Sequence, residues 1–298
     1  MKLLLPVDIV HSAEPTINEL KRLVDLKNCQ VTMLYVKEEL PSYERMIEGL
    51  ADLKERYTHE VQSKAKAYFA QIEPELSPLC QSVDTQIVSG TAAMMIEAVA
   101  RDENCELTAL TPGVHPKVEE FFLGSVSSKV VKHGPGTVLI CRSNGKPLDK
   151  INKVVIGVDG SAQSQAAVRE AVKLFKLKEH NAEITLIHVV SVADVLKLVS
   201  PVEYIGIVEN NMLMEGETFL ANAKQLLSEQ GIEKVFCVLK EGDPATEILN
   251  LTKSLPADLI VIGAQGRNAV QHFLLGSVSH RIAMHAPVTT AVVKSSRK

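Results

Sequence analysis

Residues 276–279 read Gly276-Ser277-Val278-Ser279, and the same four residues occur 152 positions earlier as Gly124-Ser125-Val126-Ser127. Asp8 corresponds in the same way to Asp159, with an offset of 151. Further identities share the offset of 152, namely Gly90 with Gly242, Leu107 with Leu259, His133 with His285, and Pro135 with Pro287. A nearly constant offset along both halves predicts a duplicated domain of about 150 residues, which is within the usual domain size.

The duplication sets the expected domain boundaries. We expect one domain over residues 1–143 and a second over residues 151–298. The stretch Ser143-Asn144-Gly145-Lys146-Pro147 lies between them and is rich in turn-forming residues, which suits a short linker. A chain of 298 residues also has the length at which two domains are the default expectation.

Apolar strand-like runs alternate with helical patterns within each half. In the second half the predicted strands are Val154–Val158, Ile184–Val190, Val235–Leu239, Leu259–Ile262 and Val288–Val293. The predicted helices are Gln163–Phe175, a segment within 205–229, one from Gly242-Asp243-Pro244 to about Leu251, one from about Ser277 and, in the first half, 42–71. Short β-branched runs that alternate with helices predict βαβ units around a parallel sheet, and hence an α/β fold.

The composition excludes several classes of protein. The net charge is −4 and neither half is basic, which argues against a nucleic-acid surface. The five cysteines form no CxxC pair, which disfavours a disulfide framework or a structural zinc site and favours a reducing compartment. The N-terminal apolar run is too short for a signal peptide, and no apolar stretch approaches roughly 20 residues. We therefore expect a cytoplasmic protein with no membrane partner.

The expected sheet brings two unusual sequences together. Doubly wound sheets bind ligands beyond the carboxyl ends of their strands, at the point where the strand order reverses. If the first strand is central and the chain later crosses to its other side, this crevice lies between strands one and four. In the second half those strands end at Asp159 and at the glycine-rich loop that begins with Gly263.

The loop reads Gly263-Ala-Gln-Gly266-Arg-Asn-Ala-Val-Gln-His-Phe-Leu-Leu-Gly276-Ser277 and has the chemistry of an anion site. Glycines let backbone N–H groups approach a ligand, and N–H groups turned inward form an anion-binding concavity. Ser277 is placed to cap the next helix, whose first turn favours a phosphate, and the hydroxyls of Ser277 and Ser279 add donors. Asp159 can accept a hydrogen bond from an adenine amino group or a ribose.

Each of these features also has a plain structural explanation. A pair of glycines after a strand is usually a turn, and Ser277 can cap a helix without any ligand. An aspartate before Gly160-Ser161 is commonly a turn or capping residue. Taken together at the expected switch point, the features favour a phosphate-bearing ligand.

The spacing Gly263-x2-Gly266-x9-Gly276-Ser277 resembles, without a mismatch, the ATP-binding motif of the universal stress protein family. The resemblance extends to Val155–Ser161, Gly242-Asp243-Pro244 and Ala286-Pro287-Val288, and it covers nearly the whole chain as two tandem copies. It implies two tandem doubly wound domains, each with a five-stranded parallel sheet of order 3-2-1-4-5 flanked by helices.

The resemblance also implies a ligand and the residues that hold it. The expected cofactor is ATP with Mg²⁺, and the adenine would meet Asp159 and the backbone near Val189. Ribose and phosphates would be held by Gly263, Gly266, Gly276 and the turn formed by Ser277, Val278 and Ser279. The Arg267 side chain can contact a phosphate, although an exposed arginine in a loop is more often solvated.

The first half departs from the motif. Thr111 and Val114 stand where the second half has Gly263 and Gly266, and Pro112 and Gly113 give the loop another shape. A β-branched valine resists positive φ and crowds the path of the phosphates. We therefore expect one competent ATP site, in the second half. A weaker ligand at the surviving Gly124–Ser127 turn stays open, as does a purely structural copy.

Little in the sequence indicates catalysis. The chain has no GxxxxGK[ST], HExxH, GxSxG, CxxC or GxGxxG motif, and so lacks the P-loop lysine. His280 and His285 are spaced onto different sides of a helix, which disfavours a metal site. We expect no catalytic residue and at most slow ATP hydrolysis.

Three functions remain open at this point. The first is an ATP-binding stress-response regulator, the second a slow ATPase, and the third a scaffold or a module for another small ligand.

The fifth strand of each half is apolar and would be an exposed sheet edge if it had no neighbour. These strands are Thr137–Cys141 and Val288–Val293, and we expect them to pair with each other within the chain as a pseudo-dimer. A further homodimer, and a lid or partner surface at Val195–Tyr204, are weaker expectations.

Overall fold

The computed structural model describes residues 1–38, 50–111, 123–142, 150–191, 205–267 and 275–294. The elements of the first half, in chain order, are β1 (Lys2–Pro6), α1 (Glu14–Leu23), the short 3-10 helix η1 (Leu26–Asn28), β2 (Gln30–Lys37), α2 (Leu50–Leu76), β3 (Ser82–Ser89), α3 (Ala92–Asp102), β4 (Leu107–Leu110), α4 (Ser125–His133) and β5 (Thr137–Ile140). Those of the second half are β6 (Lys153–Gly157), α5 (Ala162–Leu174), β7 (Glu183–Val190), α7 (Ile205–Glu229), β8 (Val235–Glu241), α8 (Pro244–Ser254), β9 (Leu259–Gly263), α9 (Ser277–His285) and β10 (Thr289–Val293).

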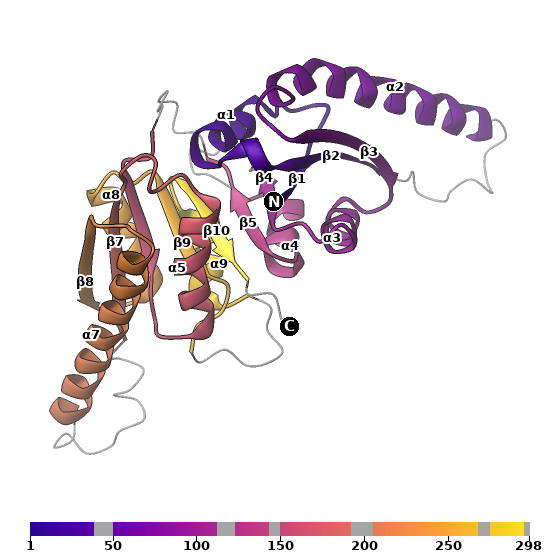
Figure 1. Ribbon diagram of the computed structural model, residues 1–298. Helices are drawn as coiled ribbons and strands as arrows, with labels where there is room; N and C mark the ends of the chain where they lie inside the picture. The colour runs from indigo at the N-terminus through magenta and orange to yellow at the C-terminus, as the bar shows by residue number, and fades with distance from the viewer. Residues whose placement is uncertain (39–49, 112–122, 143–149, 192–204, 268–274, 295–298) are drawn as a thin grey trace.

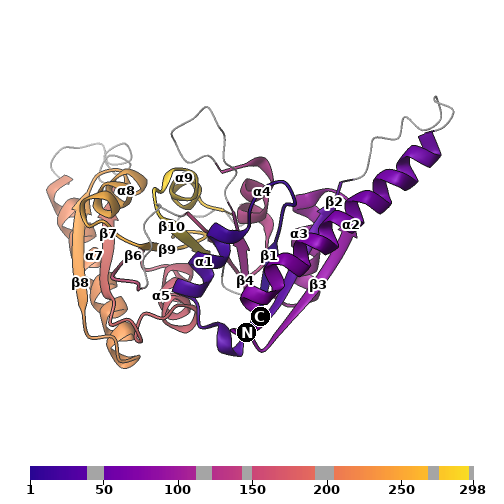
Figure 2. The same cartoon turned by 90° about the horizontal axis from the view of Figure 1, so that it is seen from above.

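The strands form one ten-stranded sheet in the order β3-β2-β1-β4-β5-β10-β9-β6-β7-β8. Within each half all neighbouring strands are parallel, and counted from the start of the half their order is 3-2-1-4-5. The predicted α/β class and strand order are therefore confirmed. Figure 2 shows β8 and β3 at the opposite ends of the sheet.

The two halves meet through β5 and β10, which lie side by side in Figure 1 and pair antiparallel, as expected for the two apolar fifth strands. Leu139 stands opposite Ala291, and these two residues are equivalent under the 152-residue repeat. Val24 and Phe175, which are also repeat equivalents, form an isolated antiparallel bridge. Equivalent residues that face each other indicate that a pseudo-two-fold axis passes through the β5–β10 contact, which we call the seam between the two halves.

Alternating side chains of the strands supply a core on each face of the sheet. On β1, Leu3 and Leu5 join one core and Leu4 joins the other, as the two-residue period of a strand requires. Helices α1, α2, α5 and α7 cover the first face, and α3, α4, α8 and α9 cover the second. Both cores contain residues of both halves, so the seam is part of the hydrophobic interior.

Most predicted ends of helices and strands lie within two or three residues of the observed ones, but α2 differs more. It runs to Leu76 and contains Pro74, whereas the predicted helix ended at residue 71. A proline inside a helix removes one backbone hydrogen bond. Ile72 and Leu76 are nevertheless buried in the core, 5% and 0% exposed, and this burial offsets the loss.

Three predicted features fall outside the described residues. They are the linker at Ser143–Pro147, the segment Val195–Tyr204, and the first-half loop positions from Pro112 to Val114. Within the described part of the chain, no helix combines the length and the apolar character needed to cross a membrane.

Candidate functional site

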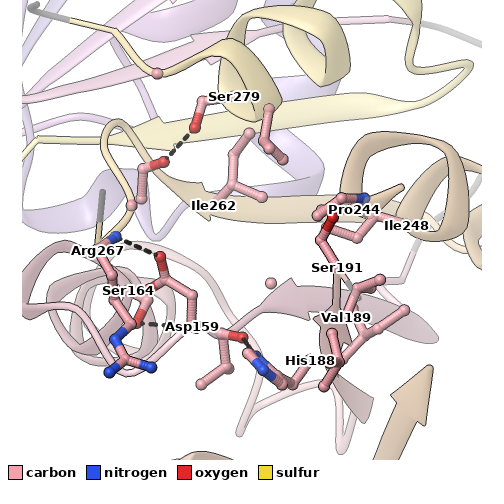
Figure 3. Close-up of a pocket in the computed structure, with 18 of the residues that line it drawn as sticks. Asp159, Ser164, His188, Val189, Ser191, Pro244, Ile248, Ile262, Arg267 and Ser279 are labelled. Carbon is pink, nitrogen blue, oxygen red and sulfur yellow. Dashed lines mark hydrogen bonds between the residues drawn. The ribbon is translucent and has the colours of Figure 1, made fainter. Parts of the chain in front are cut away.

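A cavity of about 530 Å³ opens in the second half, at the carboxyl ends of β6, β7 and β9. The N-terminal turns of α8 and α9 border it, as the positions of Pro244 and Ser279 in Figure 3 show, and Met212 and Glu215 of α7 also line it. All nine residues that the sequence singled out line this cavity: Asp159, Val189, Gly263, Gly266, Arg267, Gly276, Ser277, Val278 and Ser279. Strand order explains why they meet, because β6 lies between β7 and β9.

Asp159 ties two parts of the cavity wall together. Its Oδ1 atom accepts hydrogen bonds from the backbone N–H and the hydroxyl of Ser161, at 3.0 and 2.6 Å. Its Oδ2 atom accepts one from the backbone N–H of Arg267, at 3.0 Å. The carboxylate thus joins the turn after β6 to the loop after β9, a role that the sequence did not indicate. A carboxylate has about four lone-pair positions, so it keeps room for a further donor.

Gly263 and Gly266 are needed because other groups approach them closely. A Cβ atom at Gly266 would stand 2.6 Å from Oδ2 of Asp159, and one at Gly263 would stand 2.8 Å from the backbone carbon of Gln163. Neither glycine has a φ in the left-handed region. The prediction that this motif requires positive φ is therefore wrong, and the requirement is for space.

Helix α9 presents an uncapped N-terminus to the cavity. The N-cap residue is Gly276 and not Ser277 as predicted, so the cap has no side-chain hydrogen bond. The first-turn N–H groups of a helix have no intrahelical partner. The Gly276 N–H bonds to the carbonyl of Ala264 at 2.8 Å, which fixes the end of the helix against the loop.

The two serine hydroxyls of this turn differ in what they can do. Ser279 donates its hydroxyl to the carbonyl of Gly263 at 2.7 Å and is 5% exposed. It holds the helix onto the end of β9, so this hydroxyl already has a partner within the protein. The donors that remain at this turn are the Ser277 hydroxyl and the backbone N–H groups of the helix.

His188 lies on the floor of the cavity, beside Asp159, and was not among the residues that the sequence singled out. Its Nδ1 atom lies 2.7 Å from the carbonyl oxygen of Val158, and its ring packs edge-on against Phe219 with centroids 5.5 Å apart. Gly216 of α7 makes this packing possible, because a Cβ atom there would lie 2.5 Å from the imidazole. His188 and Val189 at the end of β7 thus form the floor beside Asp159, as Figure 3 shows.

The Arg267 side chain points toward α7. Its Nη1 atom lies 2.9 Å from the Glu215 carboxylate, and its guanidinium lies 4.8 Å from the centre of the Phe219 ring. The sequence left open a contact with a phosphate or a solvated side chain, and the structure adds the pairing with Glu215. Both charged groups are about half exposed, so the pair is a weak one.

The charged side chains around the cavity are mostly acidic. Asp159, Glu215 and Asp243 line it together with a single cation, Arg267, and no lysine is among its described lining residues. Asp243 caps α8 by accepting from the hydroxyl and N–H of Thr246, and it pairs with Arg281 of α9 at 2.8 Å. These contacts, led by the Thr246 hydroxyl, lower the pKa of Asp243.

The corresponding residues of the first half are arranged differently. Asp8 accepts from the backbone N–H of Val10 at 2.9 Å and lies 2.7 Å from Nδ1 of His11. The hydroxyl of Thr111, at the position of Gly263, shares a hydrogen bond with that of Thr16. Residue 111 thus carries a side chain at a position where, in the second half, the backbone of Gln163 leaves no room for one beside Gly263. Val114, the position that corresponds to Gly266, lies outside the described residues.

Comparison with known proteins places the chain in a family. The model of the universal stress protein family matches residues 1–142 and, a second time, residues 150–294. The universal stress protein YxiE of Bacillus subtilis is 33% identical over 149 residues, which are 48% of this chain and 99% of that protein. The universal stress protein MJ0531 of Methanocaldococcus jannaschii is 34% identical over 155 residues, or 52% of this chain and 88% of that protein.

Solved structures agree on the fold. The crystal structure of a universal stress protein from Archaeoglobus fulgidus matches with a TM-score of 0.68 and covers 98% of this chain and 96% of its own. At 20% sequence identity this likeness speaks for the fold alone. The family match covers both halves, and the strand order of each half agrees with it. This chain belongs to the universal stress protein family and carries two copies of the family's domain in tandem.

Proposed function

We propose that the second half binds ATP together with Mg²⁺, and that the bound nucleotide alters the shape or the partners of a cytoplasmic stress-response regulator. The observation that carries this proposal is the uncapped N-terminus of α9, which opens into the cavity beside Asp159. A helix N-terminus offers N–H donors and a positive dipole end, and both favour a phosphate. The cavity, at about 530 Å³, is within the range of small-molecule sites.

The walls suit the two ends of a nucleotide. Val189, Ile248 and Ile262 give one part of the cavity an apolar surface on which a base can pack. The Ser277 hydroxyl and the first-turn N–H groups of α9 supply donors elsewhere on the cavity wall. The acidic side chains and the shortage of cations favour a nucleotide whose phosphate charge is partly neutralised by Mg²⁺. Adenine is chosen over other bases from the family's motif and from the acceptor that Asp159 offers to an amino group.

Binding without rapid turnover is the better account of these residues. Phosphoryl transfer needs groups that stabilise charge and orient the nucleophile. Arg267 is engaged by Glu215, and Nδ1 of His188 is engaged by the Val158 carbonyl. A slow ATPase and a scaffold that binds another small ligand remain the alternatives.

Calorimetry of the nucleotide-stripped, full-length chain with ATP and Mg²⁺ tests the proposal. We expect one site per chain, and Gly266→Val should abolish binding because its side chain would begin 2.6 Å from the Asp159 carboxylate. Gly206→Ala is the matched control, since a Cβ atom there meets nothing within 4 Å. Thermal melts confirm that both variants are folded.

Two outcomes would redirect the proposal. The absence of saturable binding across the millimolar range would overturn it and favour the scaffold. Release of many phosphates per chain under excess ATP would instead favour the ATPase. Titration with ADP, AMP, cyclic AMP and GTP, under the same conditions, shows how far the site discriminates the phosphates and the base.

A further inference from the structure

The last strand of each half is followed by a basic residue that reaches across the seam. Arg142 follows β5 and donates through Nη2 to the carbonyl oxygens of Ala283 and Met284 in the last turn of α9. Lys294 follows β10 and donates to the carbonyl of Gly134, the C-cap residue of α4. Arg142 and Lys294 are equivalent under the repeat, so the two contacts are reciprocal.

Both contacts are placed where a helix needs a cation. The last carbonyl groups of a helix have no intrahelical partner, and the C-terminal end carries a partial negative charge. Each basic residue therefore completes the last helix of the other half. The two helices, α4 and α9, also touch across the seam.

Arg142 is unusually buried for a cation. It is 2% exposed, and its Nε and Nη1 atoms have no hydrogen-bond partner among the described residues. Its backbone N–H bonds to the hydroxyl of Thr289 at 3.0 Å, and that hydroxyl donates in turn to the buried Glu19 carboxylate at 2.7 Å. Burial also lowers the pKa of Arg142 to about 10. Burying a cation costs desolvation free energy, and the side-chain hydrogen bonds of this guanidinium all go to the last turn of α9.

The other end of α9 is the N-terminal turn of the cavity. The helix has nine residues and is thus about 13 Å long. Because it is short and rigid, a displacement of its C-terminal turn also displaces its N-terminal turn. Its N-terminus is held by the bonds from Gly276 to Ala264 and from Ser279 to Gly263. Arg142 is the anchor at the opposite end.

We propose that Arg142 is a positioning residue for the nucleotide site of the second half. By holding the C-terminal turn of α9, it sets where the N-terminal turn meets the phosphates. The first half thus contributes to a site that lies entirely in the second half, although its own motif is incomplete. The effect on ligand affinity rests on the proposed function, whereas the effect on α9 does not.

Arg142→Met tests the proposal because it removes the charge and the donors and keeps most of the bulk. At pH 7 and without nucleotide, we expect faster amide hydrogen exchange in α9 and unchanged exchange in β6 and β9. The dissociation constant for ATP with Mg²⁺ should rise about fivefold, the size of a typical charge–helix-end interaction. Arg142→Lys, which copies the residue at the equivalent position, should restore most of both properties.

Lys294→Met is the matched control, because it removes the reciprocal contact at the half that lacks the complete motif. It should speed exchange in α4 and leave the affinity for ATP unchanged. If Arg142→Met does not fold, Arg142→Gln, which keeps a donor without the charge, takes its place in the comparison with Arg142→Lys.

Unchanged exchange in α9 together with unchanged affinity would overturn the proposal, and so would an equal loss of affinity in Lys294→Met. If the wild-type chain binds no nucleotide, the proposed function fails. The exchange of α9 in the Arg142 variants then still decides whether the anchor exists.

Discussion

Gly266 lies so close to Asp159 that a Cβ atom on it would stand 2.6 Å from Oδ2 of the carboxylate. The same oxygen accepts the backbone N–H of Arg267, the next residue along the chain. Two segments separated by more than 100 residues are thereby joined at the edge of the cavity. The glycine motif and the aspartate are parts of one structure, and a change in either should disturb the other.

Asp159→Asn should destabilise the fold and weaken ligand binding. The new amide group would present its own N–H donors to the N–H of Arg267 or to the donors of Ser161. Loss of such bonds costs about 1–3 kcal/mol in the free energy of unfolding. Denaturant unfolding measures the loss, and ATP titration measures the accompanying fall in affinity.

Asp8→Asn is the control for this prediction, because Asp8 is the repeat equivalent of Asp159 and is exposed. Its bonds go to Val10 and His11 within the same turn. The free energy of unfolding should change by no more than about 0.5 kcal/mol. Equal losses in the two variants would show that Asp159 does not join the two segments.

Glu215→Gln should increase the affinity for ATP. The exposed pair with Arg267 is worth little to the fold, so the free energy of unfolding should stay within about 0.5 kcal/mol of the wild type. A neutral side chain removes one negative charge from the cavity wall and leaves Arg267 able to turn toward a phosphate. We expect a two- to fivefold lower dissociation constant, which corresponds to a gain of about 0.3–1 kcal/mol in binding free energy. The dissociation constant should also depend more steeply on salt concentration.

Glu217→Gln provides the comparison, since Glu217 lies on the same helix but does not line the cavity. It changes the net charge equally and should leave affinity as in the wild type. Tighter binding in both variants would mean that overall charge, and not the pair with Arg267, controls affinity.

Lys294 should make stability depend on pH above neutrality. Burial lowers the pKa of Lys294 from 10.5 to about 8 in the fold, against a smaller opposing effect of Glu97. Between these values the unfolded chain holds more protons than the folded one, so the contribution of this group to stability rises with pH. Below pH 8 the lysine is charged in both states and the folded state carries the cost of burying it.

Lys294→Met removes this titration. The difference in unfolding free energy, wild type minus variant, should increase from pH 7.5 to 9.5, by less than the single-group limit of about 1.4 kcal/mol per pH unit. Denaturant unfolding at several pH values measures it. Parallel profiles for the two proteins would show that Lys294 does not titrate in this range.

The fold could be predicted from the sequence because its signals are local and repeated. Short apolar strands bounded by glycine, proline and aspartate recur in both halves, and the offset of Gly124 and Gly276 ties the halves together. The end of α2 could not be predicted, since Pro74 argues for a stop and only tertiary burial of Leu76 explains why the helix continues.

The sequence indicates which residues line the cavity better than it indicates their contacts. The spacing of Gly263, Gly266 and Gly276 places them correctly around the cavity, but the sequence indicates positive φ where the structure needs space. Sequence also cannot tell that the Ser279 hydroxyl is used by a carbonyl, because that bond depends on where α9 ends against β9. His188 gave no signal, since it sits within an ordinary strand and becomes part of the site only when α7 packs over it.

A single nucleotide site in the second half is tested most directly by amide hydrogen exchange of the full-length chain with and without ATP and Mg²⁺, resolved by segment. The nucleotide should protect residues 159–161, 188–190 and 276–280, and should leave exchange unchanged at 124–128, the equivalent turn of the first half. Equal protection of both turns, or protection of 124–128 alone, would contradict a single nucleotide site in the second half.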